Sequence, residues 1–228
     1  MSHFARALPF LGLIACAPAA APAPQKHRSC GRDNAEAIVQ AGAPVLRVRA
    51  ANVEPSRIAT PEFQNLIAEM IKAMRKAPGV GLAAPQIGIP LRVIVLEDPA
   101  ELASRLTDEE RHERERVPFS VRVFINPVLH PVGDDHATFF EGCLSVNGYV
   151  GLVKRSREVE VNGLDEHGAS QTWRVRGWPA RILQHEVDHI DGTLYIDRML
   201  TRSFTTAEFA KSFYAGKPIG EIRKMLGL

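Results

Sequence analysis

The sequence is poor in cysteine and in net charge, and each shortage excludes a class of protein. Only three of its 228 residues are cysteines, and two of these, Cys16 and Cys30, precede the first acidic residue. A disulfide framework of the kind that stabilises small secreted domains is therefore excluded. The formal net charge of +2 is too weak to indicate a nucleic acid or an anionic membrane as the main partner.

Long hydrophobic runs are also lacking. The apolar stretch that ends at Cys16 is far shorter than the roughly 20 residues that a membrane-spanning helix needs, and no other segment is a candidate. Acidic residues are missing before Asp33, and we interpret residues 1–36 as a targeting or linker segment that is disordered or cleaved. A mitochondrial transit peptide, a lipoprotein-like signal with Cys16 as the lipidated residue and a misassigned start codon all remain open.

The rest of the chain has the pattern of an α+β domain. With 45% hydrophobic and 24% charged residues it matches an average soluble protein. Thr60 and Pro61 suit the start of a helix, and apolar residues then recur at helical spacing. Strands joined by hairpins and followed by a late helix indicate α+β. We predict strands over 92–96, 121–125 (ended by Asn126 and Pro127), 157–161 and 172–175. Residues 101–116 are expected to form a solvated helix or loop, with Thr107 and Glu110 at capping-box spacing. A helix is expected from Pro179 to before Gly192, and two short helices over 209–214 and 219–226.

The segment Gln184-His185-Glu186-Val187-Asp188-His189 falls in the late helix. Residues four apart lie on one face of a helix, so His185 and His189 can bind one metal ion together. Glu186 is then close enough to reach a water molecule on that ion. The plainer alternative is a surface helix that happens to carry two histidines and a salt-bridging Glu. The other histidines with no such context are expected to be ordinary surface residues: His112, His130, His136 and His167.

Catalytic metal ions usually have three protein ligands and one open position, and Cys143 is the best candidate for the third ligand. It follows a strand-like segment, 137–140, in the sequence Glu141-Gly142-Cys143-Leu144-Ser145. A lone cysteine is most often a small buried apolar residue. A thiolate beside two imidazoles, however, suits Zn²⁺ or Fe²⁺ and suits Mg²⁺ or Ca²⁺ poorly.

A third segment, residues 79–88, is rich in small residues: Gly79-Val80-Gly81-Leu82-Ala83-Ala84-Pro85-Gln86-Ile87-Gly88. Its glycines and alanines let the backbone pass close to a substrate or to the metal helix. Gln86 offers an amide donor for a developing oxyanion. Taken alone, the segment fits a tight turn between a helix and a strand equally well, and it does not have the spacing of a phosphate-binding loop.

Together, these three segments resemble the peptide deformylase family, and they occur in that family's order. The likeness runs from about Ile38 to Phe204 and includes the Ala41–Arg47 opening and a strand expected over 194–197. It is closest to organelle-type members, as in Gly177-Trp178. The resemblance implies a catalytic domain over 37–205, with a helical tail over 206–228. It also implies mixed or antiparallel sheets packed around a central metal-binding helix.

The resemblance also implies roles for individual residues. Cys143, His185 and His189 would hold one divalent metal ion, Fe²⁺ with Zn²⁺ as the alternative. Glu186 would be the acid/base, and Gln86 with the backbone N–H of Leu144 would bind the oxyanion. Gly79, Val80 and Gly81 would contact the substrate backbone.

The implied reaction is removal of the N-formyl group from the N-terminal methionine of new polypeptides by metal-activated water, releasing formate. The partners would be N-formylmethionyl nascent peptides near the ribosome, without direct binding of nucleic acid. The place would be the site of translation, in a bacterial cytoplasm or a mitochondrial matrix. A metalloprotease and a non-catalytic protein that binds formylated N-termini or stores metal are the rival hypotheses.

Overall fold

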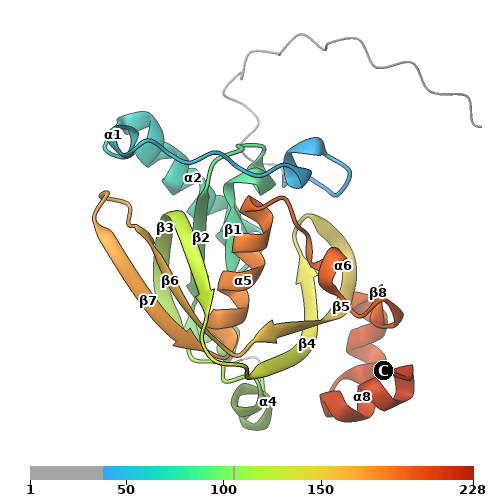
Figure 1. The fold of residues 1–228 in the computed structure, drawn as a ribbon. Coiled ribbons are helices and arrows are strands. Elements are labelled where there is room, and N and C mark those ends of the chain that lie inside the picture. The colour runs from blue at the N-terminus through green and yellow to red at the C-terminus, as the bar shows by residue number, and fades with distance from the viewer. Residues whose placement is uncertain (1–37, 105) are drawn as a thin grey trace, which may run out of the picture. The chain divides into compact units, whose positions relative to one another are not determined.

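The computed structural model describes residues 38–104 and 106–228 (Figure 1). The predictions for residues 1–36, including the lipidation of Cys16, lie outside the described residues. In the described part, every paired strand within the two sheets is antiparallel. The five-stranded sheet has the order β1 (Gly81–Ala83), β2 (Val93–Asp98), β3 (Phe119–Pro131), β6 (Glu158–Leu164) and β7 (Ser170–Arg176); the three-stranded sheet has the order β4 (His136–Cys143), β5 (Val146–Ser156) and β8 (Thr205–Thr206).

Helix α5 (Trp178–Ile190) lies between the two sheets (Figure 1). The predicted helix from Pro179 to before Gly192 is confirmed to within a residue or two at each end. The α+β class is also confirmed. The other helical elements are η1 (Pro44–Arg47), α1 (Pro55–Ile58), α2 (Pro61–Lys76), η2 (Ala84–Ile87), α3 (Ala100–Ala103), α4 (Asp108–Glu113), α6 (Tyr195–Arg198), η3 (Thr201–Ser203), α7 (Ala207–Phe209), η4 (Ala210–Tyr214) and α8 (Ile219–Leu226).

The five-stranded sheet is covered by α2 on one face and by α5 on the other. Successive residues of a strand point to opposite faces, which divides β2 between two clusters of buried side chains. Val93 and Val95 join the cluster that contains α2, whereas Ile94 and Leu96 join the one that contains α5. A strand buried on both sides needs an uninterrupted apolar run, which is why the sequence 93–96 is apolar throughout.

Several elements follow the predicted local signals. Thr60 caps α2, because its hydroxyl accepts a hydrogen bond from the N–H of Phe63. The capping box of Thr107 and Glu110 starts α4. The β6–β7 hairpin is present, with Leu164 opposite Ser170. The two short helical stretches near the C-terminus are also confirmed, as α7 with η4 and as α8.

The predicted end of a strand at Asn126 and Pro127 is wrong, because β3 continues to Pro131. Asn126 takes a left-handed conformation (φ 52°), and the register shifts between Ile125 and Val128. Its side-chain amide also exchanges two hydrogen bonds of 2.8 Å with the backbone of Val53. The turn-forming residues therefore build a β-bulge inside a long strand, as bulges allow.

The strand expected over 194–197 is also wrong. This segment forms the helical turn α6, with Leu194 in the extended conformation before it. The carboxylate of Asp197 accepts a hydrogen bond of 2.8 Å from the N–H of Leu194, which satisfies a donor that a helix start leaves free.

Candidate active site

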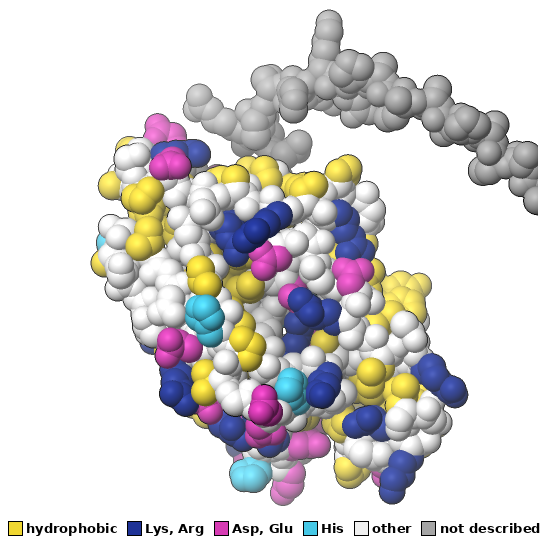
Figure 2. All heavy atoms as spheres, in the orientation of Figure 1, with side chains coloured by type: hydrophobic (Ala, Val, Ile, Leu, Met, Phe, Trp, Pro, Cys, Tyr) yellow, Lys and Arg dark blue, Asp and Glu magenta, His cyan; other side chains and the backbone are white. Residues whose placement is uncertain are grey.

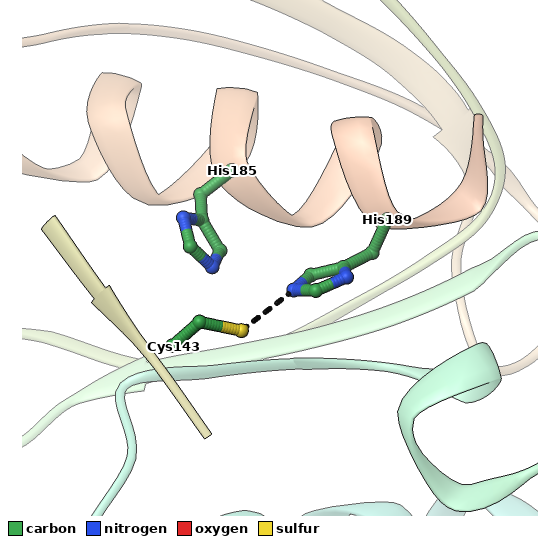
Figure 3. Close-up of side chains that lie close together, drawn as sticks. All are labelled: Cys143, His185 and His189. Carbon is green, nitrogen blue, oxygen red and sulfur yellow. Dashed lines mark hydrogen bonds between the residues drawn. The ribbon is translucent and has the colours of Figure 1, made fainter. Parts of the chain in front are cut away.

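Three side chains with metal-ligating atoms converge between α5 and β4 (Figure 3). His185 and His189 project from one face of α5, four residues apart, and Cys143 reaches them from the end of β4. Their ligand atoms all lie within 4.8 Å of one another, and the Cys143 Sγ is 3.2 Å from the His189 Nε2. The structure thus brings together the three residues that the sequence singled out.

This cluster can hold a divalent metal ion. One sulfur and two imidazole nitrogens at these separations can share one ion with bonds of roughly 2.0–2.3 Å. Three protein ligands would leave a coordination position open, as catalytic sites require. No other group of three His, Cys, Asp or Glu residues with converging ligand atoms occurs in residues 38–104 and 106–228. The histidines predicted to be ordinary surface residues are exposed: His112, His130, His136 and His167.

A buried ion-pair network contacts His185 on the ring edge that carries Nδ1. The His185 Nδ1 lies 3.0 Å from an oxygen of Glu141, which fixes the ring and turns its other nitrogen toward the cluster. Arg155 donates two hydrogen bonds of 2.9 Å to Glu141 and one of 2.5 Å to Asp188. Asp188 also accepts two from Arg198. Burial alone would raise the pKa of Glu141, but Arg155 and His185 hold it well below the ordinary value.

The two histidines have opposite pKa shifts. Burial alone would lower the pKa of His185, but hydrogen bonds to Cys143 and Glu141 outweigh it and raise the pKa well above 6.5. Burial lowers the pKa of His189 well below that value, and the charge of His185 lowers it further. The surroundings of Cys143 and Glu141 therefore favour one positive charge. A metal cation can supply this charge in place of a proton.

Glu186 is 4% exposed and lies beside these ligands. Burial raises the pKa of its carboxyl group to about 7, and its Oε2 has no hydrogen-bond partner. The backbone of Gly81 packs directly on this carboxyl group, since a β-carbon at Gly81 would lie only 2.3 Å from the Glu186 Oε1. The small residues of the 79–88 segment thus make room for a buried acid that is free to exchange a proton.

One cleft of about 350 Å³ joins these groups to the other predicted site residues. Gly79, Val80, Gly81, Gln86 and Leu144 all line it, together with Cys143, His185 and Glu186.

Gln86 is 2% exposed and held in place by its own side-chain oxygen, which accepts a hydrogen bond of 2.9 Å from the Ala83 N–H. Its Nε2 is therefore directed toward Ser145 and Cys143, at 3.3 Å and 3.6 Å.

The supporting network of Glu141, Arg155 and Asp188 was not predicted from the sequence. One signal was available: Glu141 stands two residues before Cys143 on a strand, so both side chains point to the same face. Asp188 likewise stands three residues after His185 on the helix. Nothing local marks Arg155, because its partners come from a different strand and from α5.

Comparison with known proteins identifies the family. A sequence model described as polypeptide deformylase matches residues 35–204. The chain belongs to this family. Peptide deformylase 1A of the tomato (Solanum lycopersicum) chloroplast is 52% identical over 171 residues, which cover 75% of this chain and 62% of that protein. The human mitochondrial peptide deformylase is 42% identical over 174 residues, which cover 76% and 72%.

Solved members of the family have the same fold. The class I type b enzyme of Acinetobacter baumannii, solved with Met-Ala-Ser bound, has a TM-score of 0.63 at 30% identity, with 71% of this chain and 96% of that chain covered. The Synechococcus elongatus enzyme in complex with actinonin has a TM-score of 0.60 at 38% identity, covering 72% and 80%.

The chain spans 62% and 64% of the length of the tomato and Arabidopsis thaliana relatives. Within the described residues, none of the helices combines the length and the apolar character needed to cross a bilayer.

Proposed function

We propose that this deformylase-family protein removes the formyl group from the N-terminal methionine of newly synthesised polypeptides and releases formate. The observation that carries the proposal is the position of Glu186. Its carboxyl group is buried and partly unpartnered, lies beside the Cys143, His185 and His189 ligands, and lines one cleft together with Cys143 and His185. Membership of the family supports the same reaction. The Acinetobacter baumannii relative binds Met-Ala-Ser, and a peptide that begins with Met is what the proposed reaction leaves.

The chemistry is hydrolysis of the formyl C–N bond. Cys143, His185 and His189 would hold a divalent cation, which would supply an acidified water molecule and a polarised formyl carbonyl. Glu186 would accept a proton from the attacking water as the water oxygen bonds to the formyl carbon. When the C–N bond breaks, the same carboxyl group returns the proton to the leaving amine. The other proton of the water passes from formic acid to the freed amine, so the products are formate and a protonated methionyl N-terminus.

We propose two donors for the negative charge that develops on the formyl oxygen. One is the Nε2 group of Gln86, which is directed toward Cys143, and the other is the backbone N–H of Leu144, a residue that lines the same cleft. Removing one such donor costs about 10²–10³ in rate in enzymes of this type. The segment from Gly79 to Gly81 leads into β1, which forms the edge of its sheet. Within the described residues β1 pairs with β2 alone, so the backbone of this cleft-lining segment is the part we propose to pair with an extended substrate.

We propose Fe²⁺ as the native ion, with Zn²⁺ as the alternative, because one thiolate and two imidazoles suit both. The two can be separated by their behaviour in air. A ferrous site with a thiolate ligand should lose activity as the metal and the sulfur oxidise. Protein loaded with Zn²⁺ should keep its metal under the same treatment. Full activity after prolonged aerobic storage with iron bound would argue against the ferrous assignment.

The site of action that we propose is the place of translation, a bacterial cytoplasm or a mitochondrial matrix. The relatives come from bacteria, chloroplasts and mitochondria. The substrates would be nascent chains near the ribosome. Locating a tagged chain with and without residues 1–36 tests whether this segment directs the protein elsewhere.

The decisive experiment measures formate release from formyl-Met-Ala-Ser by the full chain, purified without oxygen and with its metal quantified. Acetyl-Met-Ala-Ser serves as the substrate control. A Glu186→Gln variant should bind as much metal as the parent and release formate at least about 10²–10⁴ times more slowly. Equal rates for parent and variant would refute the role of Glu186. A metal-loaded parent without turnover would refute the function and favour a protein that binds formylated N-termini.

A further inference from the structure

The predicted tail, residues 206–228, together with Thr205, the first residue of β8, forms part of the cleft wall; this segment, 205–228, is called the tail below. Ala207, the first residue of α7, lines the cleft directly. Two further lining residues, Tyr149 and Val150, pair with Thr206 and Thr205 in the β5–β8 ladder. The tail lies wholly beyond residues 35–204, which match the family, so this part of the wall is not accounted for by that match.

The tail is fixed to the domain rather than loosely attached. Tyr214 stacks on Phe140, another residue that lines the cleft, with 5.5 Å between ring centres. Ile222 of α8 is only 2% exposed. In Figure 1 the tail lies beside β4 and β5, on the side away from the five-stranded sheet. The wall near Ala207 is therefore a built surface with a defined position relative to the metal-ligand cluster.

The strand ladder indicates how far this wall lies from the reacting group. Gly142, next to Cys143, is opposite Val150 on β5, and Val150 is opposite Thr205 on β8. Neighbouring strands lie about 4.8 Å apart, so β8 lies about 10 Å from Gly142. An extended peptide advances about 3.4 Å per residue. A peptide whose formyl group reacts beside Cys143, and whose chain runs along the cleft toward β8, would thus reach the tail with about its third residue.

The surface there is mostly apolar. Tyr149 stacks on Phe204, with 5.0 Å between ring centres, and both side chains remain more than two-fifths exposed. Phe209 and Phe213 are exposed to a similar extent. In Figure 2 the region of the tail presents hydrophobic side chains with Lys and Arg between them.

We propose that the tail is an accessory substrate-binding wall that contacts the second to fourth residues of the formylated peptide. The proposal rests on the proposed deformylase function and adds a specificity-determining residue, Ala207, together with the tail that positions it. Deformylation of formyl-methionine alone does not involve this wall.

A charge placed at Ala207 tests the contact in the full chain. The substrates are formyl-Met-Ala-Lys-Ala, formyl-Met-Ala-Glu-Ala and formyl-methionine. Ala207→Asp should raise kcat/KM for the Lys peptide and lower it for the Glu peptide, and Ala207→Lys should do the reverse. Each change should be about two- to fivefold, the size expected of an exposed ion pair. Formyl-methionine should be unaffected. A merely structural role of the tail would not give this reciprocal pattern.

Ala215 provides the matched control, because it is an exposed alanine of the same tail that does not line the cleft. Ala215→Asp and Ala215→Lys should leave the preference between the two peptides unchanged. If the Ala207 pair behaves like the Ala215 pair, the proposal is wrong.

Calorimetry separates the proposed deformylase function from the proposed contact between the tail and the peptide. It measures binding of the unformylated peptides Met-Ala-Lys-Ala and Met-Ala-Glu-Ala to the same variants. Failure of the deformylase function would abolish formate release but not the reciprocal binding preference. Failure of the wall would abolish that preference while formate release continued.

Discussion

Replacing Gly81 with alanine should disable the proposed acid/base without removing it. The φ of Gly81 is not in the left-handed region, so alanine strains nothing in the backbone. The added β-carbon, however, would lie 2.3 Å from the Glu186 Oε1 and 2.8 Å from its Cδ. An ordinary contact starts near 3.4 Å, so the carboxyl group or β1 must move by about 1 Å.

A misplacement of about 1 Å can cost about 10²-fold in rate, and complete loss of general acid–base catalysis costs about 10²–10⁴-fold. We therefore expect kcat for formyl-Met-Ala-Ser to fall by about two orders of magnitude in Gly81→Ala. Overpacking a buried site costs typically about 1–3 kcal/mol, so the variant should still fold, which thermal denaturation and metal content will check. Gly220→Ala is the matched control, because nothing lies within 4 Å of a β-carbon there. A fully active Gly81→Ala variant would refute the contact between Gly81 and Glu186 as a constraint on catalysis.

Three further predictions concern the metal ligands and the ion pairs. Cys143→Ser removes a proposed metal ligand. Loss of a residue that only supports a ligand costs about 10–100-fold in metal affinity, so this variant should lose more than that. Equal metal content of parent and variant after dialysis would contradict the assignment of Cys143 as a ligand. Arg155→Met leaves the buried carboxylate of Glu141 without its main partner. The free energy of unfolding, measured in urea, should fall by about 3–5 kcal/mol. A loss below about 1 kcal/mol would refute the contribution of this ion pair to stability. Arg75→Met removes a half-exposed partner of Glu97 and should cost at most about 1 kcal/mol at neutral pH. The hydrogen bond from Arg75 lowers the pKa of Glu97, so this contribution is present above the ordinary pKa of a Glu and is lost as the pH falls through the lowered value; a difference between parent and variant that persists in strong acid would contradict it.

The sequence predicted best where the structural cause is local. His185 and His189 are four residues apart on one helix, so their convergence follows from helix geometry alone. The start of α2 likewise follows from Thr60 and Pro61. The meeting of Cys143 with the histidines is non-local. Ligand chemistry made Cys143 the best candidate for the third ligand, and the likeness of the motifs to a known family supported that choice, but nothing in the local sequence predicts the contact.

Three of the features that the sequence did not predict have a tertiary cause. Asn126 and Pro127 are turn-forming residues, yet the hydrogen bonds of Asn126 with Val53, 73 residues away, hold it in a bulge within β3. The partners of Arg155 come from β4 and from α5, so neither its burial nor its role can be inferred from its neighbours in the chain. The same applies to Ala207, which is an unremarkable alanine until β8 pairs with β5.

The three proposed ligands come from two layers of the molecule, which gives the cation a mechanical consequence. Cys143 belongs to the three-stranded sheet, and both histidines belong to α5. A bound ion is therefore a cross-link between layers that are also joined by the Arg155 ion pair with Asp188, by hydrogen bonds of α5 to β4 and β5, and by packing. Ligand binding to the native state alone adds about 2.7 kcal/mol of stability when free metal is at one hundred times its Kd. The melting temperature should thus report the free metal concentration, and chelation should loosen the β4–β5 hairpin from α5 before the five-stranded sheet unfolds.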